Sequence, residues 1–135
     1  LNWIAEASGA AIGDGATTSF AGGERALTPL SPVHLRAARQ QGGIALSWIR
    51  RGRLPADSWT AAEIANDEGF ERYRIEILDG GSIVRTVETT APDWFYAVAD
   101  ELADFGMAQS SLTFRVAQAG KHVPWGVGRT ATCKP

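Results

Sequence analysis

Hydrophobic and polar residues alternate in four short stretches of the chain, between residues 33 and 37, 44 and 50, 72 and 78, and 112 and 117. A repeat of two residues is typical of antiparallel strands with one buried face. In the third stretch, Arg72, Arg74 and Glu76 are predicted to face outward. The predicted inward sets are Val33 and Leu35; Ile44, Leu46 and Trp48; Tyr73, Ile75 and Ile77; and Leu112, Phe114 and Val116.

Turn-forming sequences separate these stretches. "QQGG" follows the first stretch, "DGGS" follows the third, and "AGKHVPWG" follows the last. Glycine adopts the positive φ that tight hairpins need, so "DGGS" predicts a hairpin between "YRIEIL" and "IVRTVE". Short strands separated by such turns predict an all-β, antiparallel, immunoglobulin-like β-sandwich of about seven strands.

Two segments depart from the alternation. Residues 50–70 form a long polar connection, in which Asp57 or Ser58 is placed to cap a helical turn. Residues 96–105 instead space Val98, Leu102 and Phe105 at helical intervals. We therefore expect a short helix that lies on the sandwich with these three side chains and precedes the sixth strand.

The chain divides near residue 29. Residues 1–28 are rich in glycine and small residues, and we expect an extended arm of strands and turns or a remnant of a preceding domain. Pro29 and Pro32 each remove a backbone donor and favour extended geometry before them. The sandwich is therefore predicted over residues 29–135. The start at Leu1 leads us to expect a piece of a longer polypeptide.

Composition excludes several classes of function. The chain has 135 residues, 44% hydrophobic and 21% charged, with a net charge of −2, which is typical of a globular domain. Nucleic acid binding needs a concentrated cationic face, so no nucleic acid partner is expected. The longest apolar runs are a few residues, too short for membrane insertion.

The sequence offers little catalytic chemistry. His122 and the single cysteine, Cys133, lack the closely spaced partners of a zinc site and the orienting group of a Cys–His pair. The carboxylates around Glu68 and around Glu101 are interpreted as solvated loop charge. We therefore expect a protein that is not an enzyme and binds no metal and no cofactor.

The candidate contact residues lie in loops, where binding residues concentrate. Tryptophan is a frequent anchor at interfaces and on sugars, although partial capping of the sandwich explains the same residues equally well. The basic string after the second strand suits an anionic partner, and a solvated edge is its simpler explanation. The candidates are Trp59, Lys121, His122, Trp125, Arg50, Arg51 and Arg53.

The order of these strings resembles a fibronectin type III domain. A proline-led first strand, "SPVHL", precedes "ALSWIR", "YRIEIL", "LTFRVAQ" and the glycine-rich "WGVGRTAT". The resemblance implies that Trp48 fills the core against Tyr73, Ile75 and Phe114. Such domains usually carry a tyrosine where Phe114 stands, and its hydroxyl holds the preceding loop. Phenylalanine has no hydroxyl, so the loop around Leu102 must be held in another way.

A closer resemblance covers residues 25–133. "RALTPLSPVHLRA", "GGIALSWIRRGR", "YRIEILDGGSIVRTVET" and "FRVAQ" are similar to the C-terminal end of phage tail-tip proteins, and most to the host-specificity protein of gene transfer agents. This resemblance implies a virion protein at the distal tail tip, extracellular in the mature particle. It also implies baseplate or fibre proteins as partners, contact with a host receptor or glycan, and a homotrimer in the particle.

Two other functions remain as alternatives. A carbohydrate-binding module would stack Trp59 or Trp125 on host sugars, with arginine and aspartate neighbours fixing the orientation. A hydrolase is a remote third hypothesis, because it needs two carboxylates that face each other across a cleft.

Overall fold

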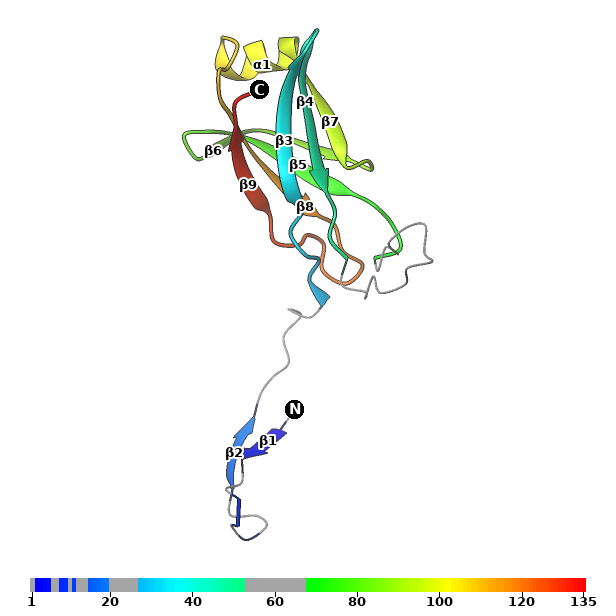
Figure 1. The fold of residues 1–135 in the computed structure, drawn as a ribbon, viewed down its shortest axis with the longest axis vertical. Helices are drawn as coiled ribbons and strands as arrows, with labels where there is room; N and C mark the ends of the chain where they lie inside the picture. The colour runs from blue at the N-terminus through cyan, green and yellow to red at the C-terminus, as the bar shows by residue number, and fades with distance from the viewer. Residues whose placement is uncertain (1, 6–7, 10, 12–14, 20–26, 53–67) are drawn as a thin grey trace.

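The computed structural model describes residues 2–5, 8–9, 11, 15–19, 27–52 and 68–135 (Figure 1). Arg53, Trp59 and the helical turn expected near Asp57 lie outside the described residues. Within the predicted arm, β1 (Asn2–Ala5) and β2 (Ala16–Ser19) form an antiparallel pair. None of the described helices is long and apolar enough to cross a membrane.

Seven strands form two antiparallel sheets, which confirms the predicted sandwich (Figure 1). One sheet has the order β3-β4-β7 and the other the order β6-β5-β8-β9. The strands are β3 (Val33–Gln40), β4 (Gly43–Ile49), β5 (Tyr73–Asp79), β6 (Ser82–Thr89), β7 (Asp93–Ala97), β8 (Leu112–Gln118) and β9 (Arg129–Cys133).

The core lies between the sheets and contains nine of the eleven residues that the alternation predicted to face inward. Leu35 is only partly buried against this core, and Val33 does not belong to it. Trp48 is buried and meets Tyr73 edge to face, with ring centroids 5.3 Å apart. Such aromatic pairs contribute about 0.5–1.5 kcal/mol beyond their buried area. The fully or almost fully buried members are Ile44, Leu46, Trp48, Tyr73, Ile75, Ile77, Tyr96, Leu112, Phe114 and Val116.

The predicted hairpin turns are also present. Gly80 and Gly81 connect β5 to β6 with φ of 55° and 94°, and Gly42 connects β3 to β4 with φ of 89°. These values lie in the left-handed region that disfavours other residues. The adjacent Gly43 is required for space, because a Cβ there would lie 2.2 Å from the carbonyl oxygen of Tyr96.

The predicted helix exists as α1 (Val98–Phe105) and precedes β8, the sixth strand of the sandwich. The prediction that Val98, Leu102 and Phe105 all face the sandwich is wrong in part. Phe105 packs against the core, but Val98 and Leu102 are 42% and 48% exposed. The fully buried helix residue is Glu101. Apolar spacing alone therefore did not identify the side of α1 that faces the sandwich.

Glu101 is buried because an arginine and a backbone amide satisfy its carboxylate. Arg39 of β3 donates from Nη1 to Oε2 at 2.7 Å and from Nη2 to Oε1 at 3.0 Å. The backbone N–H of Gln109 donates to Oε1 at 2.7 Å, and its carbonyl accepts from Arg39 at 2.7 Å. The hydrogen bond from Arg39 holds the pKa of Glu101 below its ordinary value, although burial opposes this shift.

A second carboxylate, Asp104, ties α1 to strands of both sheets. Arg85 of β6 donates from Nε and Nη2 to Asp104 at 2.6 and 3.0 Å, and the Tyr96 hydroxyl of β7 donates to Asp104 at 2.7 Å. The bond from Arg85, aided by the one from Tyr96, lowers the pKa of Asp104. These bonds hold the segment around Leu102. Phe114 cannot hold it, because phenylalanine lacks the hydroxyl of the tyrosine that usually stands at this position.

Candidate functional site

The loop between β8 and β9, residues 119–127, is fastened at several points. The Ala119 N–H donates to the carbonyl of Arg72 at 2.8 Å, and the Gly126 N–H donates to that of Gln118 at 2.8 Å. The Lys121 N–H donates to the Glu68 carboxylate at 2.7 Å. Glu68 is only 3% exposed, so its interpretation as solvated loop charge is wrong, as it is for Glu101. The loop therefore has a defined shape.

The segment that leads into the first strand of the sandwich also packs on this loop. A Cβ at Gly120 would lie 2.6 Å from the Pro29 ring, and one at Gly126 would lie 2.5 Å from the Pro29 carbonyl oxygen. The Ser31 hydroxyl donates to the carbonyl of Val127 at 2.7 Å. Glycine at both positions thus allows the buried Pro29 to lie directly against the loop.

Trp125 lies beside Arg74 of β5 and beside Arg72, the residue that directly precedes this strand. The guanidinium carbons of Arg72 and Arg74 are 5.2 and 4.9 Å from the centroid of its ring system. These distances are typical of cation–π interactions, which strengthen as the site is desolvated. Arg72 also pairs with Glu88 of β6 at 3.0 Å. The result is a half-exposed surface of one aromatic ring and two cations.

The arginines continue across the outer face of the four-stranded sheet. Glu76 was predicted to face outward, and it does so, but it is only 6% exposed. Arg74 contacts it at 3.3 Å and Arg115 of β8 covers it from the neighbouring strand. Two cations around one carboxylate leave positive charge in excess next to Trp125.

The predicted contact residues occupy different places. Lys121 and His122 are exposed on the same loop as the half-buried Trp125. Arg50 pairs with Glu71 at 3.2 Å. Arg51 is exposed and lines a depression of about 270 Å³ together with residues 28–31 and Val127. Arg53 and Trp59 lie outside the described residues.

Sequence reasoning missed the contribution of Arg72 and Arg74 to this surface. The alternation placed both on one outer face, yet it could not show what lies over them. Pairing of β5 with β8 places the chain after Gln118 next to Tyr73 and Arg72. This long-range register brings Trp125 onto the two arginines.

The described residues hold no group of three or more histidine, cysteine or acidic side chains arranged to bind a metal ion. A surface depression of about 400 Å³ is lined by Arg72, Glu88, Thr89 and Thr90. Its polar lining contains one carboxylate, which pairs with Arg72. The pair of facing carboxylates that hydrolysis of a sugar needs is not found in this lining.

Comparisons with known proteins support the fold. The sequence matches no known protein family and no curated protein. A solved structure described as "FN3tt mut" is 12% identical with a TM-score of 0.50, and the match covers 78% of this chain and 93% of that one. The extracellular domains d3–d4 of rat CD45 are 14% identical with a TM-score of 0.50, covering 98% of this chain and 62% of that one.

The protein therefore contains a β-sandwich of the fibronectin type III kind. Identities of 12% and 14% define the fold alone.

Proposed function

We propose that this domain is a non-enzymatic docking module at the tip of a phage or gene transfer agent tail. Its partners are baseplate or fibre proteins, its host contact is a surface receptor, and it assembles as a homotrimer in the particle. The resemblance of residues 25–133 to tail-tip proteins supports the location. The fold supports a role in interaction rather than catalysis.

The observation that carries the docking role is the surface formed by Trp125, Arg72 and Arg74. Tryptophan and arginine are the residues most enriched among those that dominate binding energy at protein interfaces. Lys121 and His122 extend the surface on the same loop. Because the loop is already fastened by Glu68 and Pro29, docking requires little additional ordering.

The arrangement favours a protein partner over a sugar. Two guanidinium groups lie about 5 Å from the centroid of the Trp125 ring system, so a stacked sugar would compete with at least one of them. A carbohydrate-binding module therefore remains the alternative outcome of the test rather than a second proposal.

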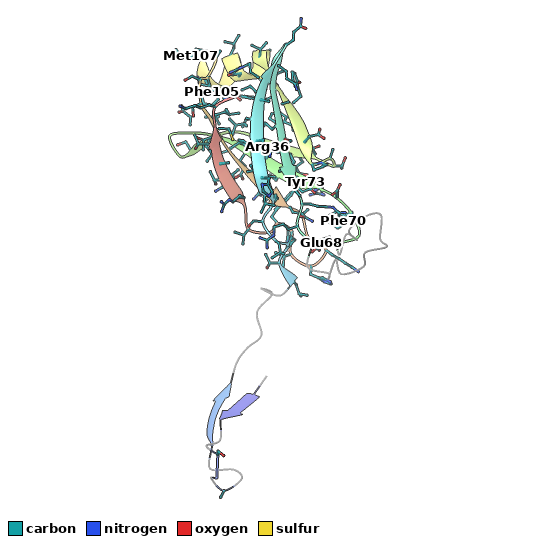
Figure 2. All side chains as sticks on the ribbon, viewed as in Figure 1. Arg36, Glu68, Phe70, Tyr73, Phe105 and Met107 are labelled. Carbon is teal, nitrogen blue, oxygen red and sulfur yellow. The ribbon has the colours of Figure 1, made fainter. Side chains whose placement is uncertain are left out.

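The test places Trp125→Ala in the full-length protein within assembled particles. Antibodies against the domain should label the distal tail tip, and cross-linking should join the domain to neighbouring tail proteins. The variant should weaken this association about thirtyfold, since a dominant interface residue contributes about 2 kcal/mol. Met107→Ala is the matched control, because Met107 is 65% exposed at the opposite end (Figure 2).

Two outcomes would contradict the proposal. Absence of the chain from purified particles would exclude the tail-tip location. Saturable binding to host glycans that Trp125→Ala abolishes, without cross-links to tail proteins, would identify a carbohydrate-binding module instead.

A further inference from the structure

Strand β3 contains an irregularity opposite Trp48. Val33 pairs with Ile49 and Arg36 pairs with Ser47, so His34 and Leu35 together oppose the single residue Trp48. This is a β-bulge, a feature that often changes the direction of a functional side chain. His34 has a φ of 53° and is the one non-glycine residue with positive φ in the described part of the chain. Such strained backbone is concentrated at binding sites.

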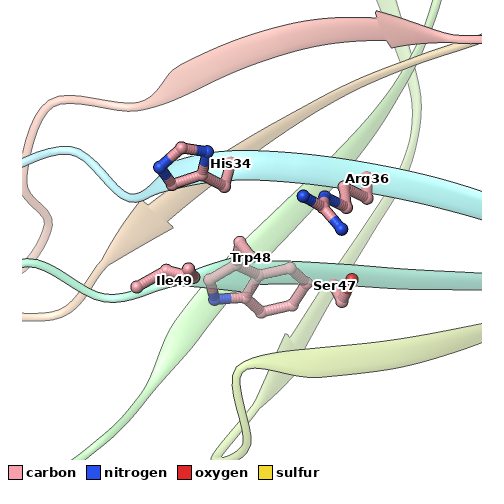
Figure 3. A pocket seen from close by; sticks show the side chains of 5 residues that line it. All are labelled: His34, Arg36, Ser47, Trp48 and Ile49. Atoms are coloured by element: carbon pink, nitrogen blue, oxygen red, sulfur yellow. The ribbon is translucent and has the colours of Figure 1, made fainter.

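The bulge borders a small pocket on the outer side of the three-stranded sheet. The pocket has a volume of about 190 Å³, and Figure 3 shows His34 and Arg36 on one side with Ile49 and Ser47 on the other. A guanidinium, an imidazole and a hydroxyl can all donate hydrogen bonds into it. The buried indole N–H of Trp48, which also lines the pocket, has no acceptor among the described residues.

Arg36 also differs from the arginines of the neighbouring elements. Arg39, Arg85 and Arg115 each contact a carboxylate. Within the described ranges, neither Arg36 nor His34 has such an ion pair. The acidic residue of strand β7, Asp93, is paired in register with Ser47, so it lies on the same outer face as Arg36 but one strand further away. It is not among the residues that line the pocket. The pocket thus presents donors and positive charge, and none of the residues that line it carries a carboxylate.

We propose that this pocket binds a carboxylate side chain, glutamate or aspartate, of a partner protein. The guanidinium of Arg36 would take both carboxylate oxygens, and His34 and Ser47 would donate to the remaining acceptor positions. The apolar surface of Ile49, 56% exposed, would cover the methylene groups of the partner residue. This inference rests on the proposed docking role and adds a second contact on a different sheet.

The test titrates the 135-residue chain, observed by NMR, with a glycine–serine peptide that carries one central glutamate. The resonances of Arg36, His34 and Ser47 should shift, with a dissociation constant on the order of millimolar for one charge-assisted contact. The matched peptide with glutamine should leave them unchanged. Arg36→Gln should weaken binding at least about tenfold, whereas Arg51→Gln, at another exposed arginine, should not.

His34 permits a second, independent measurement. His34→Gly should raise the melting temperature by about 2–5 °C, because glycine adopts positive φ without strain, and should weaken peptide binding. Unchanged peptide binding in this variant would overturn the role of His34.

Other outcomes overturn the site itself. Shifts of the same size with the glutamine peptide, or equally tight binding of inorganic phosphate, would show that the pocket does not select carboxylates. Because the docking proposal is tested at Trp125 in particles, failure of the peptide titration leaves that proposal standing.

Discussion

Both ends of the sandwich contain a buried carboxylate, but they differ in the contacts that their arginines make. At the helix end, formed by α1 and residues 106–109, the carboxylates of Glu101 and Asp104 turn inward to arginines. At the loop end, formed by residues 68–72 and 119–127, Arg72 lies against Trp125 at the surface. Figure 2 marks the ends by Phe105 and Met107 on one side and by Glu68 and Phe70 on the other.

This difference separates a structural role from an interaction role. A buried ion pair with additional hydrogen bonds defines one geometry, and breaking it leaves an uncompensated charge. Half-exposed ion pairs such as Arg72–Glu88 contribute about 0–1 kcal/mol, so their side chains can be shared with a partner at little cost. We therefore expect mutations at the helix end to change stability and mutations at the loop end to change binding.

The largest expected effect comes from Arg39→Met. The substitution leaves the fully buried Glu101 with one backbone donor, Gln109, and should lower the free energy of unfolding by about 3–5 kcal/mol. Arg36→Met on the same strand is the control and should stay within about 0.5 kcal/mol of the unchanged protein. Urea unfolding followed by tryptophan fluorescence measures both. Equal changes in the free energy of unfolding for Arg39→Met and Arg36→Met would contradict the special structural role of Arg39.

An intermediate effect is expected from acid. The pKa values of Glu101 and Asp104 are lower in the folded state than their ordinary values of 4.5 and 3.8. The unfolded state therefore binds protons first, so this stabilisation is present above about pH 5 and is lost as the pH falls below 4. Urea midpoints measured between pH 6 and pH 2 should fall less steeply in Glu101→Gln/Asp104→Asn. If the urea midpoints of the unchanged protein and of the double variant fell in parallel with pH, the result would argue against the stabilising role of the two ion pairs.

The smallest effect compares two buried tyrosines, one at each end. The Tyr96 hydroxyl donates at 2.7 Å to Asp104, which has little exposure, whereas the Tyr73 hydroxyl donates at 3.0 Å to the more exposed Glu71. Tyr96→Phe should cost about 1.5–3 kcal/mol and Tyr73→Phe about 1 kcal/mol or less. Thermal unfolding monitored by circular dichroism tests the order of the two variants. A larger loss of stability in Tyr73→Phe than in Tyr96→Phe would contradict the stabilising role of the helix end.

The candidate surface could be predicted from the sequence only in part. The loop sequence "AGKHVPWG" identified Lys121, His122 and Trp125 as neighbours, because all three lie within a few residues of one turn. Arg50 was a candidate as part of the basic string after the second strand, and it pairs with Glu71. Arg72 and Arg74 were assigned only to an outer face. Arg53 and Trp59 lie outside the described residues, so the structure does not test these two candidates.

The sequence by itself determined most of the sandwich strands, the hairpin turns, most of the core and the existence of α1, but it did not predict β7 or its buried Tyr96. Each of the predicted features follows from local rules, because side chains alternate along a strand and glycine permits tight turns. The tertiary structure decided which charges are buried. Glu101 meets an arginine 62 residues away, and Lys121 meets the Glu68 carboxylate across 53 residues. The cost of burying a carboxylate depends on such partners, and they become neighbours only when the sheets pack.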